Sequence, residues 1–533
     1  MLMTLYFIDR MCIQTMTVNL SLLTITILLL GVMLSLNYSH ALAQKLDSSN
    51  LSKIRIVDPN PTLIDNKTGS LINDTSLAAN ITEIRTGTIA DGVSKLLLVV
   101  NYEDSVKFII VNDEDDQSSG TLSTLSSTET GPSSSVIIGP AEKDTIVSLK
   151  VAVYTPPLTY SNSSTNENHK TIKIFVQDAA NPSINTTLPL SLYRVPVVLV
   201  HGIWSNSADS WTDTGFEQSL KGKNFDVYFA EYGKYNATTF DPFENATKGN
   251  YGIDAIRNIT KSALEKYESK GIAASQVDIV AHSMGGLMAR GFTQQSDYKN
   301  DDNNMKGYIH RLITIGTPHF GAQLAGILYD HRDETYCHKW IGFRLYVTLS
   351  DYCGQTPAPT LKEIYRNASI PIDEGAVEAL KPNSTAYSNL TETKVSSYAI
   401  IGNWEPDARN SHKDLQEFYR NLIGNKSFTL EGKEAFGEDN DLQVNITSQS
   451  GGLIDYSNCD RIDSNITTGS RIFNNTIHGS LLNSNVTNSN ATNVESELNS
   501  ARIQEYVPLL LESSDDKYAT SIGVLGHICT IRN

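Results

Sequence analysis

Residues Val277–Arg290 have the sequence VDIVAHSMGGLMAR, an apolar strand followed directly by residues that suit a helix. An apolar run without polar alternation is typical of a strand whose sheet is covered on both faces. Similar strands are predicted at Val195–Val200, Phe225–Ala230, Leu312–Ile315 and Val395–Ile401, with helices predicted at Ser207–Lys221, Ile253–Lys270 and Ser500–Glu512. Strands that alternate with helices predict a doubly wound, mostly parallel α/β domain, which we place at residues 193–515.

The strand and the helix of this segment meet at Ser283. Ala281 and Gly285 lie two residues before and two residues after it. Small residues at these positions let a strand and a helix approach each other across a tight, strained turn that lifts a serine hydroxyl clear of the sheet. The pattern is that of a nucleophile elbow, with alanine in place of its first glycine, and it makes Ser283 the candidate nucleophile.

A second motif, His201-Gly-Ile-Trp204, directly follows the strand Val195–Val200. Acyl transfer builds negative charge on a carbonyl oxygen, and two backbone N–H groups aimed at that oxygen stabilise it by several kcal/mol, on the order of 3–4 for one donor. We expect these donors at Met284, directly after the nucleophile, and at Ile203 in the loop. We expect His201 to brace the loop and His282 to be structural.

Together, VPVVLVHGIW and VDIVAHSMGGLMAR resemble the lipase/esterase branch of the α/β-hydrolase superfamily. The segment LITIGTPHFGA, residues 312–322, is similar to the part of these lipases that leads from the sheet into a lid. The resemblance implies a Ser–acid–His triad in that chain order and hydrolysis of carboxylic esters, with acyl esters or lipids as substrates. It implies neither an organic cofactor nor a metal.

The resemblance also guides the choice of the acid. In similar lipases it lies in an Asn-Asp-Gly-x-Val segment with a serine seven residues later. Asp441 matches, with Val444 and Ser448 at the corresponding positions, although Leu442 replaces the usual glycine. Asp439 is the alternative acid.

Two histidines follow Asp441 in the chain, His478 and His527. His478 precedes the predicted helix at 500–512, where similar hydrolases place the catalytic histidine, whereas His527 lies beyond that helix in a tail at 516–533. Chain order therefore favours His478 as the base, with His527 as the alternative.

The region Phe320–Lys394 interrupts the strand–helix alternation and is predicted to be a lid or cap. Its aromatic residues are either an acyl-site lining or ordinary cap packing, namely Tyr329, Trp340, Phe343 and Tyr346. Acyltransferases, thioesterases and amidases use the same triad, so they remain alternatives to an esterase or lipase. A non-catalytic cell-surface binding protein is the alternative from a different class.

Before the α/β domain, short β-rich runs separated by polar turns recur from residue 81 to 192. They lie at Lys95–Asn101, Ser105–Val111, Ser135–Ile138, Thr145–Tyr154 and Thr171–Val176. This spacing predicts a β-sandwich-like domain, either a binding module or a solubilising cap. The polar stretch 44–80 is predicted to be a linker or an irregular first segment.

The amino terminus indicates export. Val18–Leu36 is uncharged and apolar, and small residues up to Ala43 suit signal-peptide cleavage, although an uncleaved membrane anchor fits residues 1–43 as well. Many Asn-x-Ser/Thr sequons follow, including Asn80, Asn185, Asn258, Asn389 and Asn445. They predict a secreted or cell-surface glycoprotein, with an association with a membrane surface or the cell envelope as a further expectation.

Four cysteines lie beyond Ala43, at positions 337, 353, 459 and 529. An even number outside the cytosol predicts two disulfides; three pairings are open, and the short loop favours Cys337–Cys353.

Length and charge set outer limits. The chain has 533 residues, and at about 100–200 residues per domain it should contain several domains. A net charge of −17 argues against nucleic acid as a partner, because phosphate binding needs clustered Lys and Arg.

Overall fold

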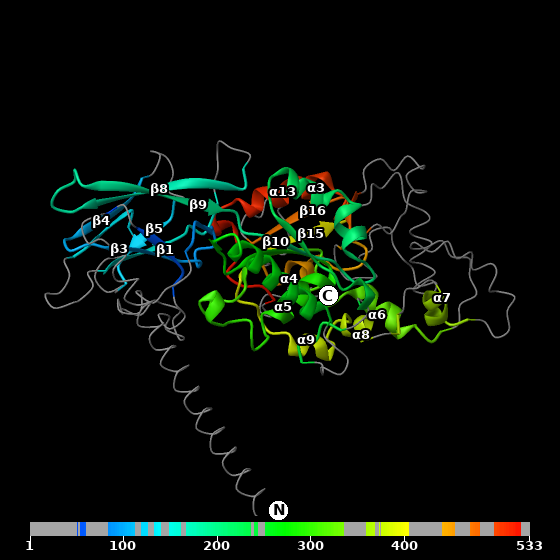
Figure 1. Ribbon diagram of the computed structural model, residues 1–533. Coiled ribbons are helices and arrows are strands. Elements are labelled where there is room, and N and C mark those ends of the chain that lie inside the picture. The colour runs from blue at the N-terminus through cyan, green and yellow to red at the C-terminus, as the bar shows by residue number, and fades with distance from the viewer. Residues whose placement is uncertain are drawn as a thin grey trace, which may run out of the picture.

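A computed structural model of the chain places a β-rich part beside an α/β part (Figure 1). It describes residues 51, 54–59, 84–111, 119–125, 133–139, 149–160, 167–235, 239–243, 251–334, 359–367, 372–373, 375–404, 440–453, 469–479 and 495–523. The predicted signal or anchor at 1–43 and all five cysteines lie outside these residues. Among the described helices, none is both long enough and apolar enough to cross a bilayer.

The β-rich part consists of two sheets that face each other. One has the strand order β1-β3-β7-β5, and the other is a mixed sheet with the order β12-β2-β9-β8-β4-β6. The strands are β1 Arg55–Val57, β2 Gly87–Ile89, β3 Leu96–Asn101, β4 Val106–Val111, β5 Thr121–Ser123, β6 Ser135–Ile138, β7 Leu149–Thr155, β8 His169–Asp178, β9 Asn185–Tyr193 and β12 Ile272–Ala273. Alternate residues from both sheets, such as Leu98, Phe108 and Ile174, form one buried core. This is the packing of a β-sandwich.

Three of the predicted runs in this part agree closely with β3, β4 and β6, and a fourth lies within the longer β8. The run Thr145–Tyr154 overlaps β7 from Leu149 onward, and its residues 145–148 lie outside the described residues. β1 lies inside the stretch 44–80, where we expected a linker or an irregular segment. Its three residues pair antiparallel with β3, so this short piece completes a sheet edge. A three-residue strand has too little periodicity to be recognised without its partner.

The α/β part is built on a six-stranded parallel sheet with the order β11-β10-β13-β14-β15-β16. Its strands are β10 Val197–Val200, β11 Val227–Ala230, β13 Val277–His282, β14 Ile309–Ile315, β15 Ser396–Asn403 and β16 Ser470–Asn474. Every residue of β10, β13 and β14 is buried, as expected for central strands covered on both faces.

Helices cover both faces of this sheet (Figure 1). Residues 198 and 200 of β10 pack toward α4 Tyr251–Glu268 and α5 Met284–Phe292. Residues 197 and 199 pack toward α3 Phe216–Gly222 and α13 Ala501–Leu511 on the other face. The alternation follows from the two-residue period of a strand. The predicted helix at 207–221 is in fact a π-helix, η3 Ala208–Thr212, followed by α3.

The insertion between β14 and β15 is helical where it is described. Its helices are α6 Gln323–Asp330, α7 Leu361–Asn367, α8 Gly375–Ala379 and α9 Thr385–Asn389. Arg290 joins the end of the insertion to α5, because its buried guanidinium donates to the backbone oxygens of Leu390 and Thr391.

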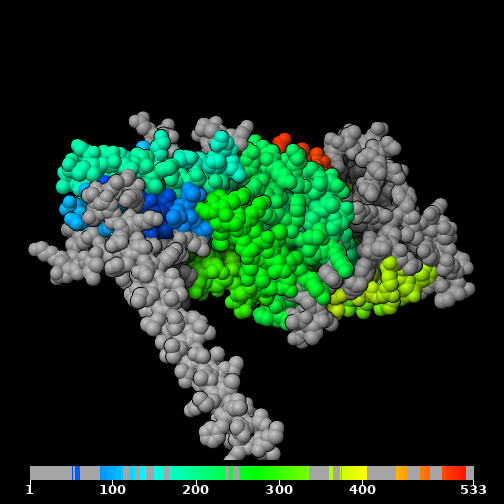
Figure 2. All heavy atoms as spheres, in the orientation of Figure 1, coloured from blue at the N-terminus to red at the C-terminus, as the bar shows by residue number. Residues whose placement is uncertain are grey.

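The β-rich and α/β parts are in direct contact along the face that Figure 2 shows. β12, which follows α4, pairs with β2 and so extends a sheet of the β-rich part. Arg311 of β14 donates to the Thr159 hydroxyl at 2.9 Å and to the Asp515 carboxylate at 2.8 Å. The carboxyl-terminal segment and both parts therefore meet at one buried guanidinium.

Candidate active site

Ser283 lies at a sharp turn between β13 and α5. Its backbone has φ 54° and ψ −130°, a region that non-glycine residues rarely occupy. A Cβ at Gly285 would lie 2.5 Å from the carbonyl oxygen of His201, so no larger residue fits there. A Cβ at Gly202 would lie 2.8 Å from the Ser283 Cβ. The glycines therefore allow the two loops to pack against Ser283, as the elbow pattern predicts.

Ser283, His478 and Asp441 form a continuous hydrogen-bonded chain. The Ser283 Oγ lies 2.7 Å from His478 Nε2, and His478 Nδ1 lies 2.7 Å from Asp441 Oδ2. The three residues follow β13, β17 Thr476–Ile477 and β15, and they are 5%, 4% and 0% exposed. β13 and β15 are parallel strands of one sheet, so the segments after their carboxyl ends meet at one edge of it, and β17 comes directly after β16 of the same sheet. The structure thus brings together the three residues that the sequence motifs and the family resemblance predict.

The Asp441 carboxylate is held in place by its own loop. Its Oδ1 accepts the N–H groups of Gln443 at 2.9 Å and Val444 at 2.7 Å. The Asp441 carbonyl oxygen accepts the backbone N–H of His478 at 3.0 Å. These contacts fix the carboxyl group in the orientation in which Oδ2 faces His478 Nδ1.

Ser448 and Gln449 anchor this acid loop to two neighbouring segments. The Ser448 hydroxyl donates to the Gly321 carbonyl at 2.7 Å and accepts the Phe320 N–H at 3.0 Å. The Gln449 side chain exchanges hydrogen bonds with both backbone groups of Gly402, at 2.7 and 3.0 Å. A serine seven residues after the acid therefore has a physical function here: it joins the acid loop to the Thr-Pro-His turn.

The two expected oxyanion donors flank Ser283. Met284 is the first residue of α5, where a backbone N–H has no partner within the helix. The Ile203 N–H belongs to the same peptide unit as the Gly202 carbonyl, which lies 2.9 Å from His201 Nδ1. Because a trans peptide directs its C=O and N–H to opposite sides, that hydrogen bond fixes the direction of the Ile203 N–H.

His201 is fully buried and braces the loop. Its ring stacks on Tyr232, with centroids 3.9 Å apart, and its Nε2 accepts the Tyr232 N–H at 3.3 Å. The Tyr232 hydroxyl donates to the His201 carbonyl oxygen. Glu231 lies 3.5 Å from Nε2, and this contact with His201 holds the pKa of the Glu231 carboxyl well below its usual range. The bracing role expected for His201 agrees with this arrangement.

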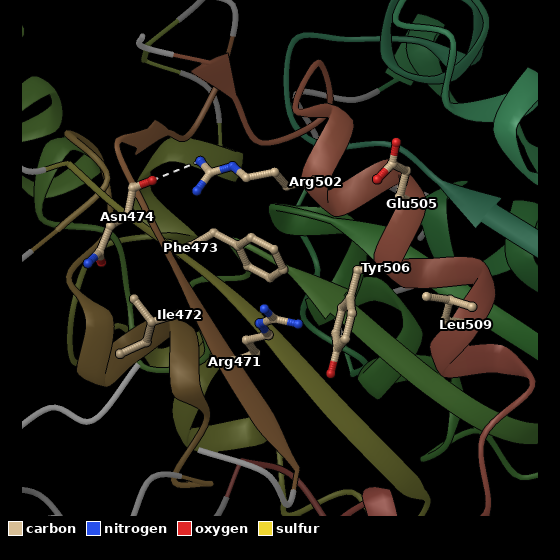
Figure 3. A pocket seen from close by; sticks show the side chains of 8 residues that line it. All are labelled: Arg471, Ile472, Phe473, Asn474, Arg502, Glu505, Tyr506 and Leu509. Atoms are coloured by element: carbon tan, nitrogen blue, oxygen red, sulfur yellow. Dashed lines mark hydrogen bonds between the residues drawn. The ribbon is translucent and has the colours of Figure 1, made fainter. Parts of the chain in front are cut away.

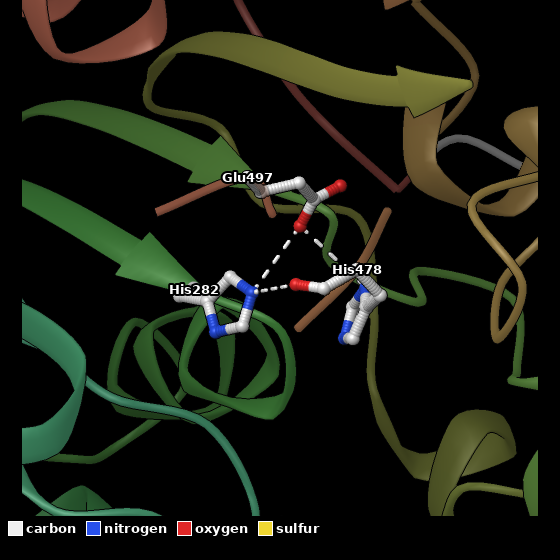
Figure 4. A group of neighbouring side chains, drawn as sticks. All are labelled: His282, His478 and Glu497. Atoms are coloured by element: carbon white, nitrogen blue, oxygen red, sulfur yellow. Dashed lines mark hydrogen bonds and ion pairs between the residues drawn. The ribbon is translucent and has the colours of Figure 1, made fainter. Parts of the chain in front are cut away.

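Glu497 is a buried acid that the sequence analysis did not select. It follows β18 Glu495–Ser496, and its Oε2 lies 3.2 Å from His282 Nε2 and 3.5 Å from His478 Nδ1 (Figure 4). Burial, reinforced by the neighbouring Asp441 carboxylate, raises the pKa of Glu497 well above its usual range. Only a short strand pairing brings it here, and no motif marks it in the sequence.

Within the described part of the chain, His282, His478 and Glu497 are the group whose donor atoms lie close enough together, within 4.8 Å, to hold a metal ion. Two of these atoms are already engaged: His478 Nδ1 with Asp441, and His282 Nε2 with the His478 carbonyl oxygen at 3.0 Å. The group is therefore arranged as a hydrogen-bond network around the triad.

The other predicted site residues do not contact the triad or lie outside the described residues. Asp439, His527, Trp340, Phe343 and Tyr346 are outside the described residues. Tyr329 of α6 is half-buried, and the cationic groups of Arg332 and Lys381 lie 3.7 and 4.6 Å from its ring. Its surroundings are those of cap packing.

A hollow of about 430 Å³ lies away from the triad, between β16 and α13 (Figure 3). Arg471 stacks over Phe473 and Tyr506 in it, and Arg502 donates to the Asn474 carbonyl oxygen at its rim. No triad residue lines this hollow, so its size does not identify it as the site of chemistry.

A family model described as a domain of unknown function, DUF7379, matches residues 177–465, more than half of the chain. The chain belongs to the DUF7379 family. The region shared with this family contains Ser283 and Asp441, whereas His478 and Glu497 lie beyond it. A comparison with curated proteins gave no match.

Among solved structures, the DUF7379 chain is similar to the lipase BlEst2 of Bacillus licheniformis in its mature form, with 18% identity, a TM-score of 0.26 and coverage of 48% of this chain and 78% of that one. It is similar to phospholipase PlaB from Legionella pneumophila, with 13% identity, a TM-score of 0.28 and coverage of 48% and 45%. An extracellular α/β-hydrolase from a Paenibacillus species shows 18% identity, a TM-score of 0.21 and coverage of 39% and 76%. These α/β-hydrolases resemble the chain over less than half of its length.

Proposed function

We propose that the protein is a serine hydrolase that cleaves carboxylic esters through Ser283, His478 and Asp441. The observation that carries this proposal is the unbroken chain from the Ser283 hydroxyl through both nitrogens of His478 to the Asp441 carboxylate, with 2.7 Å at each step. The strained backbone of Ser283 adds support, because such strain persists where the surrounding fold imposes it and is common at active sites.

The geometry supports a two-step acyl transfer. His478 Nε2 takes the Ser283 proton as Oγ attacks the ester carbonyl, while Asp441 Oδ2 stabilises the imidazolium through Nδ1–H. The N–H groups of Ile203 and Met284 hold the oxyanion. His478 then gives its proton to the leaving alcohol, and afterwards activates the water that hydrolyses the acyl-enzyme.

The experiment that tests this proposal is labelling with a fluorophosphonate, together with p-nitrophenyl esters of increasing chain length. We expect labelling of the folded protein and loss of it in Ser283→Ala, with a fall of about 10⁴-fold or more in ester turnover. His478→Ala should have the same effect, whereas His527→Ala should keep most of the activity. Folded protein that is neither labelled nor active would favour a non-catalytic binding protein.

Acyl esters, including lipids, are the substrate class we propose, and chain-length preference in the same screen tests this point. Acyltransferase, thioesterase and amidase activities use the same machinery and are separated by offering alcohol acceptors, thioesters and amides.

We also propose that the protein acts outside the cytosol. Asn185 and Asn258 are exposed, as glycan attachment requires, while Asn389 and Asn445 are half-buried. Secretion of the full chain, with its mass compared before and after glycosidase treatment and after reduction, tests export, glycosylation and disulfides together.

A further inference from the structure

The side chain of Glu497 is fully buried beneath the triad. A Cβ at Gly316 would lie 2.1 Å from its Oε2, and a Cβ at Gly402 would lie 2.4 Å from its Oε1. The carboxyl group therefore occupies a space that two glycines, at the ends of β14 and β15, leave open for it. Burial of an acid costs free energy unless its polar atoms find partners.

Its Oε2 faces two imidazole rings (Figure 4). His282 Nε2 lies 3.0 Å from the His478 carbonyl oxygen, which can only accept, so this nitrogen carries the proton. Burial lowers the pKa of His282 to about 3, which keeps the ring neutral with that single N–H. The same N–H points toward Glu497 Oε2 at 3.2 Å, and His478 Nδ1 lies 3.5 Å from this oxygen. Oε2 is therefore an acceptor.

Asp441 and Glu497 differ in how their charges are satisfied. Asp441 accepts two backbone N–H groups and the His478 Nδ1–H. Glu497 Oε1 accepts no hydrogen bond of normal geometry among the described residues, and Glu497 lies beside the Gly402 backbone and the Asp441 carboxyl group. Burial, and after it the neighbouring Asp441 carboxylate, raise the pKa of Glu497 well above its usual range, so Glu497 holds its proton more tightly than an ordinary glutamate does. The titratable groups that face Glu497 are Asp441, His282 and His478.

We infer that Glu497 is a positioning residue that serves as a reserve acid, able to hold His478 Nδ1–H when the Asp441 carboxylate is absent. This inference rests on the proposed function. In the intact protein Glu497 carries a proton; without Asp441, the proton passes to solvent and the Glu497 carboxylate accepts the Nδ1–H that now lacks its partner. The distance to be closed is small, because both acids already face the same nitrogen.

The test compares Asp441→Ala with Asp441→Asn by the second-order rate of fluorophosphonate labelling at Ser283. An asparagine amide donates to Nδ1 and forces the wrong tautomer, so Glu497 cannot help. Alanine leaves Nδ1 free for Glu497. We expect Asp441→Ala to be labelled about 10- to 100-fold faster than Asp441→Asn. Asparagine has nearly the same shape as aspartate, so shape alone would predict the opposite order.

Two further readouts separate this role from a structural one. The ratio of Asp441→Ala to wild-type labelling should rise with pH, because only the ionised Glu497 carboxylate supplies the negative charge that stabilises protonated His478 during attack. Adding Glu497→Gln to Asp441→Ala should reduce labelling to the Asp441→Asn level. The matched control is Glu495→Gln, two residues away, whose side chain is 42% exposed and lies 3.9 Å from Arg502; added to Asp441→Ala, it should leave labelling unchanged.

The outcomes are distinguishable. If the wild type is labelled but folded Asp441→Ala reacts no faster than Asp441→Asn at any pH, the inference about Glu497 is wrong and the proposed function stands. If folded wild type is not labelled at all, both fail. Should the double variant not fold, the pH dependence of Asp441→Ala alone decides: a ratio to wild type that does not change with pH overturns the reserve role.

Discussion

Leu442 occupies a backbone position at which similar lipases have glycine. Its φ is 77°, in the left-handed region, and its side chain is fully buried in the core of the α/β part. A left-handed conformation costs about 1–2 kcal/mol for a residue with a Cβ. Burial of a leucine contributes about 1.5–3 kcal/mol, which offsets that strain. The departure from glycine is therefore compatible with the turn that presents Asp441.

This balance predicts an inverted order of stabilities. Leu442→Ala loses the buried side chain and keeps the strain, whereas Leu442→Gly loses the side chain and relieves the strain. We expect Leu442→Gly to be more stable than Leu442→Ala by about 1 kcal/mol. Urea unfolding of the two variants measures the difference. A glycine variant that is less stable, as at ordinary positions, would contradict the argument.

His319 gives a prediction about pH. Burial, reinforced by the Arg290 guanidinium, lowers the pKa of His319 well below its usual value of 6.5. The unfolded chain therefore binds a proton below pH 6.5 that the folded protein does not, and stability falls as the pH drops through this range. We expect His319→Gln to reduce the slope of the unfolding free energy against pH by about 1.4 kcal/mol per pH unit below 6.5. Denaturant titrations at pH 8 and at several lower pH values measure it; equal slopes would show that His319 is protonated when folded.

At the scale of elements, the site depends on segments that follow different strands. α12 Ile446–Ser450 carries Ser448, which links the acid loop to the turn after β14. Ser450 of the same helix donates only to Thr447, within its own segment. The two serines therefore form a matched pair: the Ser448 hydroxyl binds a different segment of the chain, whereas the Ser450 hydroxyl donates within its own helix.

We expect Ser448→Ala to destabilise the protein by about 1–3 kcal/mol, because the Gly321 carbonyl and the Phe320 N–H lose a buried partner. It should also slow labelling of Ser283, since the acid loop is less firmly held. Ser450→Ala should retain the wild-type labelling rate. Thermal unfolding and labelling of both variants test this, and an equal effect of the two substitutions would argue against the link.

At the scale of the molecule, the β-rich part is joined to the α/β part by strand pairing and by buried polar contacts. Arg311 is 1% exposed, lies over Tyr518 and donates to the Leu511 carbonyl as well as to Thr159 and Asp515. The two parts should therefore unfold together.

All four tryptophans follow residue 193, so their fluorescence reports the α/β part, whereas far-UV circular dichroism reports both parts. We expect the two urea transitions to coincide in the wild type. Arg311→Leu should lower stability by about 2–3 kcal/mol and separate the transitions. The control is Arg366→Leu, which removes an exposed ion pair and should change stability by about 0–1 kcal/mol. Coincident transitions in Arg311→Leu would show that strand pairing alone couples the parts.

The local sequence was sufficient for those features that depend on neighbours along the chain. Uninterrupted apolar runs predicted the buried strands, and the small residues around Ser283 predicted the strained turn, because both result from local sterics and burial. Asp441 and His478 required chain order and a family resemblance. Glu497, the tie made by Ser448 and the contacts of Arg311 join positions far apart in the sequence. Such contacts arise only when parallel strands and their connecting segments are brought together, since backbone pairing, not local preference, decides which side chains meet.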